Sequence, residues 1–346
     1  MKRYSIHELK NALIKVLKLN NVSDYQAMVL VDTMLAADMR GVHTHGISVF
    51  PAYINKIKNQ GFNLYSQSAV VKKTSSFAVV DANNCFGMVT ASECMKMAID
   101  EAKASGIYTV FCRNANTFGA AFRYAEMATE KGMIGMCFAN SPSAMPAWGG
   151  DRKILGTNPF AIGIPADKES PILIDMATSV VAKSKINEIR KQGGTIPEGW
   201  AVDEFGKPTT DPSAAIKGMV LPMAGHKGYA IAMAIDVLAG VLSGAGYLNN
   251  VNRFYSDDNK CMNVGHCFVV INPALVFDES FYSLMDDYIA EVHASGEKVL
   301  CPGEIENRTR SLCNDGSVEL GSETVESLEK MFAEHGIIGT LVECCE

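Results

Sequence analysis

Apolar positions near the start of the chain recur every three or four residues, which is the period of a helix that buries one face. Two such series lie within residues 9–17 and 28–36. Each follows a capping-box pattern, S-x-x-E at Ser5 and S-x-x-Q at Ser23, in which side chains satisfy unpaired backbone amides at a helix start. These patterns predict a helical hairpin with one buried face.

From about residue 76 the pattern changes to short β-branched or aromatic runs bounded by glycine or polar residues, which is typical of strands. The predicted strands are residues 77–80, 107–111, 134–138, 171–175 and 267–271. Helical patterns at 89–104 and 120–130 separate the first three strands, and each ends before a glycine that can cap it. A longer helix is expected over 228–242. Alternating strands and helices predict a layered α/β domain.

After Pro273 the pattern is helical again, most clearly at 281–292 and 325–335. We expect this tail to pack back on the N-terminal hairpin, so that the α/β domain is an insertion in a helical domain built from both chain ends. The expected boundaries are a helical part at 1–70, an α/β domain at 71–275 and a second helical part at 276–346. At 346 residues the chain is long for a single core, which agrees with two domains.

Composition and charge exclude several classes of protein. The chain is 48% hydrophobic and 20% charged, and its formal net charge of −7 comes without any block of basic residues, so we expect no nucleic-acid partner. No apolar run approaches the roughly 18 residues that span a bilayer, and residues 1–10 are polar, which predicts a cytoplasmic protein without a membrane partner. Ten cysteines contain no Cys-x-x-Cys pair, so neither a zinc cage nor a disulfide framework is expected.

The first candidate for chemistry is the segment from Arg40 to Gly46, which follows the second predicted helix and carries His43 and His45. The two histidines are two positions apart, and we expect one of them to face a cleft and the other to be structural. An imidazole is the side chain best suited to exchange a proton near neutral pH. Two surface histidines, or a metal-binding His-x-His pair, are the alternatives.

Polar and glycine-rich clusters follow several of the predicted strands. Asn114 and Asn116 lie between a strand and a helix, where an amide could orient a nicotinamide carboxamide or a substrate carbonyl. Such clusters recur at the ends of successive elements, which favours a ligand-binding cleft lined by polar residues, although ordinary turn formation explains each cluster alone. The other clusters are Asn140–Pro142, Gly149–Gly150, Gly156–Pro159 and Asp175–Ser179.

Lys227 follows His226 at the start of the predicted long helix, where the helix dipole repels a cation unless an anion is bound nearby. A phosphate would resolve this conflict, and a solvated lysine would resolve it equally well. The chain has no G-x-G-x-x-G after a strand, no P-loop and no G-x-S-x-G.

Taken in order, five segments resemble the type-2 malate/L-lactate dehydrogenase family, which includes ureidoglycolate and sulfolactate dehydrogenases, diketogulonate reductase and piperideine-2-carboxylate reductase. The segments are Ala37–Gly46, Gly156–Pro159, Asp175–Ser179, Trp200–Asp203 with Thr210–Pro212, and Leu221–Pro222 with His226–Tyr229. The resemblance spans most of the chain. It implies an NAD(P)-dependent oxidoreductase with a non-Rossmann NAD(P)-binding α/β domain, acting at a site shared between the subunits of a homodimer.

By the same resemblance, His45 is the acid/base residue that exchanges the hydroxyl proton of a small 2-hydroxy acid while hydride passes to or from the nicotinamide. Arg40, Asn116 and Thr117 belong to the same expected catalytic group, and no metal is expected. The implied cofactor contacts are Ser141, Asp175, Met176, Ala177, Thr178, Ser179, His226, Lys227, Gly303 and Glu304.

The chain departs from the family pattern at the substrate end. Thr117 stands where the family usually has a histidine, and Val49 stands where many relatives have an arginine suited to a carboxylate. Arg123 is a candidate replacement for that arginine. These departures leave open a reductase of a cyclic imine carboxylate, or a catalytically impaired relative that keeps dimerisation and cofactor binding. A metal-dependent hydrolase that uses His43 and His45 is the remaining alternative.

Overall fold

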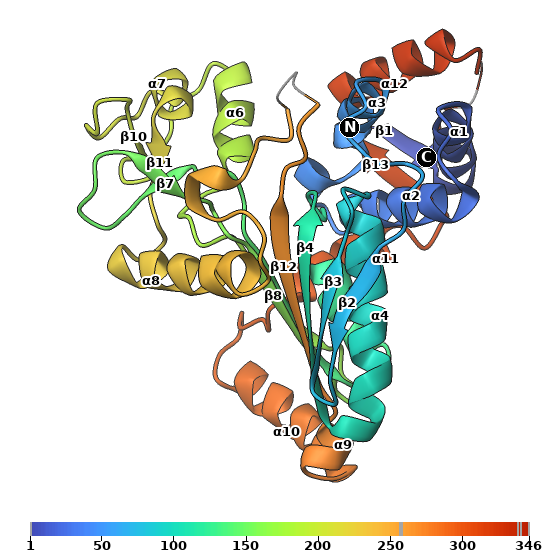
Figure 1. Cartoon of the computed structure of the whole chain (residues 1–346), viewed down its shortest axis with the longest axis vertical. Helices are drawn as coiled ribbons and strands as arrows, with labels where there is room; N and C mark the ends of the chain where they lie inside the picture. The colour runs from blue at the N-terminus through green and yellow to red at the C-terminus, as the bar shows by residue number, and fades with distance from the viewer. Residues whose placement is uncertain (1, 256–258, 338, 340, 345–346) are drawn as a thin grey trace.

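A seven-stranded mixed sheet forms the centre of the computed structural model, which describes residues 2–255, 259–337, 339 and 341–344 (Figure 1). In spatial order the strands are β2 (Ala69–Lys73), β3 (Phe77–Asp81), β4 (Ile107–Ala115), β12 (Val264–Ile271), β5 (Ile134–Ala139), β8 (Phe160–Ile164) and β9 (Ile172–Met176). Only β3 and β4 pair in parallel, and every other neighbouring pair is antiparallel. All five predicted strands are confirmed within this sheet, and β2 and β8 were not predicted.

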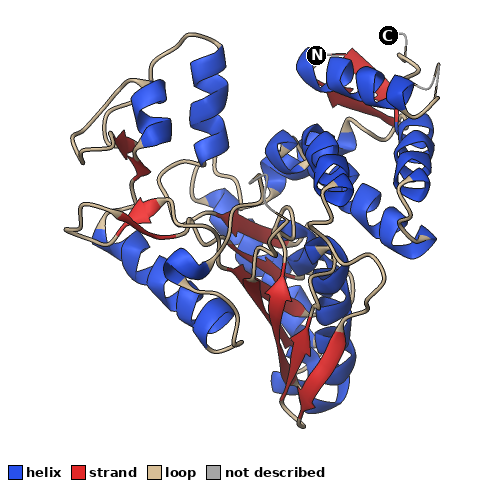
Figure 2. Ribbon diagram, turned by 45° about the horizontal axis from the view of Figure 1, so that its top comes forward, coloured by secondary structure: helices blue, strands red, loops and turns tan. Residues whose placement is uncertain are grey.

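Helices cover both faces of this sheet, as the alternating pattern predicts (Figures 1 and 2). On one face, α4 (Gly87–Ser105) and α5 (Phe122–Thr129) bury an apolar layer that includes the side chains of Val110 and Phe268. On the other face, α8 (His226–Ile235) continues into η3 (Asp236–Val241). The helix expected over 228–242 is therefore present, but its second half is a wider π-helix.

The predicted N-terminal hairpin forms and shares one apolar core with the end of the chain, but its second helix is buried on more than one face, and Met28 of the predicted apolar series is exposed. Its helices are α1 (Ile6–Leu19) and α2 (Asp24–Met39), followed by α3 (Phe50–Lys58). Residues from α12 (Ser322–Glu334) complete the core, and β1 (Lys2–Ser5) pairs with β13 (Ser317–Leu320). Both ends of the chain therefore lie in one helical layer, at the upper right of Figure 1.

Both predicted capping boxes form, but only in their serine half. The backbone N–H of Glu8 donates to Ser5 Oγ over 3.4 Å, and that of Gln26 donates to Ser23 Oγ over 3.3 Å. The N–H of Ser5 donates to the carbonyl of Val342 over 3.2 Å. A contact with the end of the chain thus replaces the second half of the first box.

The tail does not pack as one unit on the N-terminal hairpin. After α9 (Pro273–Val276), helix α10 (Ser280–Ala294) packs against the edge of the sheet through Ile289 and Ile172. Helix α11 (Glu304–Ser311) then leads back towards the N-terminal layer, where α12 lies. Helix α12 packs on the N-terminal hairpin as expected. The expectation is wrong for α10, because its buried residue Ile289 packs against Ile172 of β9 instead.

A smaller lobe with its own apolar cluster projects from the sheet near α8, at the left of Figure 1. Ile186, Ile196 and Val220 are buried at its centre. The lobe contains β6 (Met145–Pro146), β7 (Lys153–Leu155), α6 (Lys183–Lys191), β10 (Ala201–Val202), α7 (Pro212–Lys217), β11 (Met219–Val220) and η4 (Leu248–Asn250).

None of the helices among the described residues is long and apolar enough to cross a membrane. The nine described cysteines are free thiols, and Cys345 lies outside the described residues.

Candidate active site

The segment that follows α2 is anchored by the buried carboxylate of Asp38. Asp38 Oδ1 accepts a hydrogen bond from His43 Nδ1 over 2.8 Å, and Oδ2 accepts the N–H of Ile47 over 2.6 Å. A Cβ atom at Gly46 would lie 2.2 Å from Oδ1 of Asp38, so only glycine allows this approach. The hydrogen bond with Asp38 raises the pKa of His43. His43 is therefore the structural member of the histidine pair.

His45, two positions further along, lines two cavities. Its Nδ1 lies 3.1 Å from Thr44 Oγ1, a contact between neighbouring side chains in η1 (His43–His45). The ring is accessible from the cavities, yet protein encloses it on other sides, and this desolvation lowers the pKa of His45 below its ordinary value. An imidazole of this kind is neutral near pH 7 and can accept a proton.

The first cavity has a volume of about 640 Å³ and carries positive charge. Lys183 and Arg253 line it together with His45, Thr117 and Val49. Desolvation, followed by repulsion from Lys153 and Arg253, lowers the pKa of Lys183 to about 8. The cavity can therefore hold a small anion close to a neutral imidazole. Its apolar walls include Tyr53, Met88, Phe254, Tyr255 and Met262.

The second cavity has a volume of about 960 Å³ and extends from His45 along the end of β9. Asp175 Oδ2 accepts the N–H of Phe122 over 2.9 Å, which holds the carboxylate at the cavity wall. Enclosure by protein raises the pKa of Asp175 to about 6. Besides His45, six of the predicted catalytic and cofactor-binding residues line this cavity, namely Arg40, Ser141, Asp175, Met176, Ala177 and Gly303.

The two cavities share part of their lining, so they form one continuous cleft with His45 at its waist. The shared residues come from the loop after α2, the loop after β4, the loop after β5 and the start of α6, with Tyr255 as the last. They are Thr44, His45, Gly119, Pro142, Ala144, Lys183, Ser184 and Tyr255. A small ligand in the first cavity and an elongated ligand in the second would meet at the imidazole.

The guanidinium of Arg40 is committed to the protein rather than to the cleft. Arg40 is 5% exposed, and its Nη2 lies 2.5 Å from Oε1 of the buried Glu126. Arg40 Nη1 donates to Asn307 Oδ1 over 2.7 Å, and Arg310 Nη1 also reaches Glu126 over 2.7 Å. Arg40 therefore links α2, α5 and α11 beneath the second cavity.

Asn116 and two expected cofactor contacts are buried outside the lining. The amide of Asn116 donates to Asn84 Oδ1 and to the carbonyl of Cys85, both over 2.9 Å. The hydroxyl of Thr178 donates to the carbonyl of Thr157 over 2.8 Å, and that of Ser179 to the carbonyl of Val181 over 2.8 Å. These hydrogen bonds fix the loops that carry Thr117 and Ala177.

Three further expected contacts lie away from the lining of both cavities. His226 and Lys227 are exposed at the start of α8, and neither lines the cleft. Glu304 accepts a hydrogen bond from His293 over 2.6 Å. Arg123, the expected replacement for the missing arginine, is bound to Glu126 over 3.0 Å and to Glu130 over 3.6 Å. The expectation for Arg123 is wrong, because the helical turn of α5 directs it to its own acidic neighbours.

The residues that the sequence analysis missed are Lys183 and Arg253. They are distant from His45 in the chain and belong to no motif, so no local pattern marks them. One signal was available: Lys183 follows closely on the Asp175–Ser179 segment, which contributes to the same cleft.

Comparison with known proteins identifies the family of the chain. The sequence profile described as malate/L-lactate dehydrogenase matches residues 4–329. The chain belongs to the malate/L-lactate dehydrogenase family. The resemblance noted from the five sequence segments is thereby confirmed.

Individual relatives of this dehydrogenase family cover nearly the whole chain. The malate/(S)-sulfolactate dehydrogenase of Methanothermus fervidus is 36% identical over 334 residues, covering 96% of this chain and 98% of the relative. The solved structure of sulfolactate dehydrogenase from Methanocaldococcus jannaschii matches with a TM-score of 0.90 at 36% identity, covering 97% and 98% of the two chains. A Δ1-pyrroline-2-carboxylate/Δ1-piperideine-2-carboxylate reductase of Pseudomonas putida is 27% identical and covers 95% of this chain and 96% of its own.

Proposed function

We propose that the protein is an NAD(P)-dependent oxidoreductase that interconverts a small 2-hydroxy acid and its 2-oxo acid, with His45 as the acid/base group. The observation that carries this proposal is the position of His45 at the waist of a cleft with two unlike ends. One end is compact and cationic, as a substrate acid requires, and the other is long and carries a carboxylate and a glycine turn.

The second cavity suits a dinucleotide in its size and in its donor set. Asp175 can accept hydrogen bonds from ribose hydroxyls, and Ser141 offers a hydroxyl on the same wall. Gly303 has φ +95° and packs so closely that a Cβ atom would lie 2.9 Å from Leu173 Cβ, which leaves the turn flat against β9. We therefore infer that the α/β region at 71–275 binds NAD or NADP, and that it is inserted in a helical domain from both chain ends.

The bound nicotinamide supplies the hydride acceptor or donor. In the oxidation direction, His45 accepts the proton of the substrate hydroxyl, and desolvation keeps its imidazole neutral for that step. In the reduction direction, protonated His45 returns the proton to the carbonyl oxygen. Thr44 Oγ1 contacts Nδ1, so Nε2 is the nitrogen left for the substrate.

Lys183 gives the substrate end its selectivity. A cation on the wall of one small cavity favours an acid with a second anionic group, and malate and sulfolactate, the substrates in the names of two relatives, have one. Lys183 also supplies what Val49 lacks, because a cation from a different element can bind the carboxylate. An uncharged 2-hydroxy acid side chain would leave Lys183 without a counter-charge.

Two alternatives are open, and one of them has a relative that supports it. The reductase from Pseudomonas putida favours a cyclic imine carboxylate as substrate, and Thr117 in place of a histidine agrees with it. A catalytically impaired relative would keep the cofactor cavity and lack turnover. The hydrolase alternative loses its basis, because His43 is bound to Asp38 while His45 lines the cleft alone.

A homodimer is part of the proposal. Large apolar side chains are exposed along α8 and η3, and Leu242 after them is 57% exposed. A run of this kind favours a second copy of the chain as its cover. The exposed side chains are Ile231, Met233, Val237, Leu238, Val241 and Leu242. Light scattering of the native chain and of a Val241→Lys, Leu242→Lys variant tests this, and a native monomer would contradict it.

The central experiment measures both turnover and cofactor binding in the His45→Gln variant. We expect turnover of malate or sulfolactate to fall by about 10²- to 10⁴-fold while the Kd for NADH, measured by fluorescence, changes little. His7→Gln, an exposed histidine on α1, is the matched control. Near-normal turnover in His45→Gln would remove the residue from the mechanism, and NADH binding without turnover of any acid or imine by the native chain would favour the impaired relative.

A further inference from the structure

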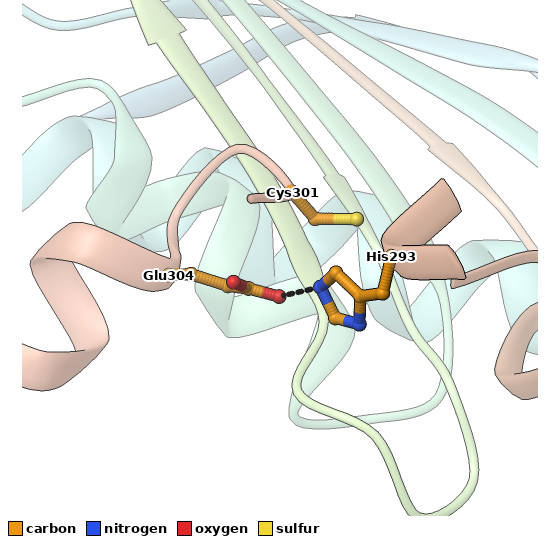
Figure 3. A group of neighbouring side chains, drawn as sticks. All are labelled: His293, Cys301 and Glu304. Atoms are coloured by element: carbon orange, nitrogen blue, oxygen red, sulfur yellow. Dashed lines mark hydrogen bonds and ion pairs between the residues drawn. The ribbon is translucent and has the colours of Figure 1, made fainter. Parts of the chain in front are cut away.

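Three side chains with different ligand atoms converge where α10 ends and α11 begins. His293 lies in the last turn of α10, Glu304 is the first residue of α11, and Cys301 lies in the connection between them (Figure 3). Their ligand atoms all lie within 4.8 Å of one another. No other group of three or more His, Cys, Asp or Glu residues in the described part of the chain has this proximity.

The donor set matches a borderline-soft divalent cation. A tetrahedral zinc site with bonds of about 2.0 Å to nitrogen and 2.3 Å to sulfur separates its ligand atoms by roughly 3.5 Å. His293 Nε2 and Glu304 Oε1 are now 2.6 Å apart in a hydrogen bond, so small side-chain rotations would open room for an ion. One thiolate and one carboxylate together neutralise a charge of +2.

The surroundings hold the ligands in place. Cys301 is 6% exposed, and its neighbour Pro302 accepts the N–H of Leu173 in β9 over 2.9 Å. Arg308 Nη2 lies 4.0 Å from the second carboxylate oxygen of Glu304, and the first oxygen faces the histidine. The side chain of His293 is 36% exposed, so an ion can enter from solvent.

We propose that His293, Cys301 and Glu304 bind a Zn²⁺-class metal ion, with water or a small ligand in the fourth coordination position. On binding, the thiol proton of Cys301 leaves to solvent and the ring proton of His293 moves from Nε2 to Nδ1. The ion then replaces the present hydrogen bond and joins α10 to α11. Cys301, Pro302 and Gly303 also line the second cavity, so the ion would fix the turn that forms part of the cleft wall.

The test titrates Zn²⁺ and Co²⁺ into the full-length, tag-free chain with reduced thiols, in the absence of cofactor. We expect one Zn²⁺ per chain by calorimetry and a sulfur-to-cobalt charge-transfer band with Co²⁺. Cys301→Ser should abolish the band, and His293→Gln should weaken Zn²⁺ binding by more than about tenfold, since even outer partners of a metal are worth about 10- to 100-fold.

Cys344→Ser is the matched control, because Cys344 is a partly exposed thiol near β1 and outside this group. It should bind both ions like the native chain. Absence of Zn²⁺ binding, or equal binding by the native chain, Cys301→Ser and His293→Gln, would overturn the proposal. Circular dichroism tests whether each variant is folded. If Cys301→Ser does not fold, Glu304→Gln replaces it as a ligand variant.

The regulatory consequence rests on the proposed cofactor role of the second cavity. When Zn²⁺ has already ordered the turn formed by Cys301, Pro302 and Gly303, NADH binding loses less conformational entropy. We therefore expect Zn²⁺ to lower the Kd for NADH by about two- to tenfold, and NADH to lower the Kd for Zn²⁺ by the same factor. An NADH affinity that Zn²⁺ leaves unchanged would overturn this role. A chain that binds Zn²⁺ but no NADH would instead refute the proposed function and leave the metal site standing.

Discussion

His43 donates from Nδ1 to the buried carboxylate of Asp38 over 2.8 Å, and this bond fixes the short segment that carries His45. Asp38 also receives the backbone N–H of Ile47 beyond the second histidine. The segment is therefore held on both sides of His45. The same two bonds leave the imidazole of His45 to the cleft.

Asp38→Asn should destabilise the fold by about 1–3 kcal/mol, because a buried charge-assisted hydrogen bond is lost. Turnover should fall with it, since His45 would lose its position. Urea denaturation and steady-state kinetics measure the two effects. Asp32→Asn on the same helix is the control, because the pair of Asp32 with Lys10 is exposed and worth little. Equal stability of the two variants would contradict the anchoring role of Asp38.

Stability should also depend on pH through His43. Its pKa is raised in the folded chain, so its contribution is complete below the unfolded value of about 6.5 and is lost as the pH rises through the folded pKa. The Tm of the native chain should therefore exceed that of His43→Gln by more at about pH 6 than at about pH 8. A difference that grows with pH would refute this sign.

The lowered pKa of His45 predicts the shape of the activity profile. The neutral imidazole persists below the ordinary value of about 6.5, so kcat/KM for oxidation should stay level to a pH below that value. The profile of the native chain over mildly acidic pH measures this. A loss of kcat/KM on the acid side that begins above about pH 6.5 would assign the proton transfer to a different group.

Lys183 should determine the affinity for the substrate acid. Lys183→Met should raise the KM for a dianionic substrate by about 10- to 100-fold, as expected for one charge-assisted hydrogen bond, with a smaller effect on NADH binding. Because the pKa of Lys183 is about 8, the native KM should rise above that pH, and the variant should lack this rise. Lys185→Met, which removes an exposed cation paired with Glu188, should behave like the native chain.

Thr117 lines the substrate end, where a hydroxyl cannot act as a base at neutral pH. Thr117→His should raise turnover of ordinary 2-hydroxy acids if this position has narrowed the range of substrates. A panel of lactate, malate, sulfolactate and ureidoglycolate measures the change, with Thr117→Asn as a control of similar polarity. No gain on any acid would show that the position is neutral.

Asp175→Asn should have opposite effects on stability and binding. The pKa of Asp175 is raised to about 6 in the fold from an unfolded value of about 3.9, so its ionisation destabilises the fold increasingly from about pH 4 to pH 6, and the loss is complete above that range. The variant should therefore melt slightly higher than the native chain at neutral pH and equally at about pH 4, with solvent in the cavity limiting the gain. Its NADH affinity should fall, because a carboxylate acceptor is lost. Unchanged NADH affinity would argue against Asp175 as a cofactor contact.

Local patterns were sufficient for most of the elements. The period of the apolar residues predicted the helices around Leu13 and Leu30, and the β-branched runs predicted five strands of the sheet. The strand order was beyond reach, because β12 pairs with both β4 and β5 although it follows them by more than a hundred residues. Pairing at that separation depends on the whole chain rather than on any segment.

The cleft was predictable only where a motif marked it. His45 and Asp175 lie in segments with recognisable sequence, and both line the cleft. Lys227 has an equally clear signal, a cation at a helix start, yet it is exposed outside both cavities. Lys183 and Arg253 belong to no motif and yet lie on the wall, because α6 and the segment after η4 reach the cleft from distant parts of the chain.

The contact between Gly46 and Asp38 limits how this sequence can drift. Any side chain at position 46 would occupy the space of the carboxylate, and loss of the carboxylate at position 38 would release both hydrogen bonds that hold this segment. A substitution at either position therefore disturbs the placement of His45, so we expect the two residues to be inherited together.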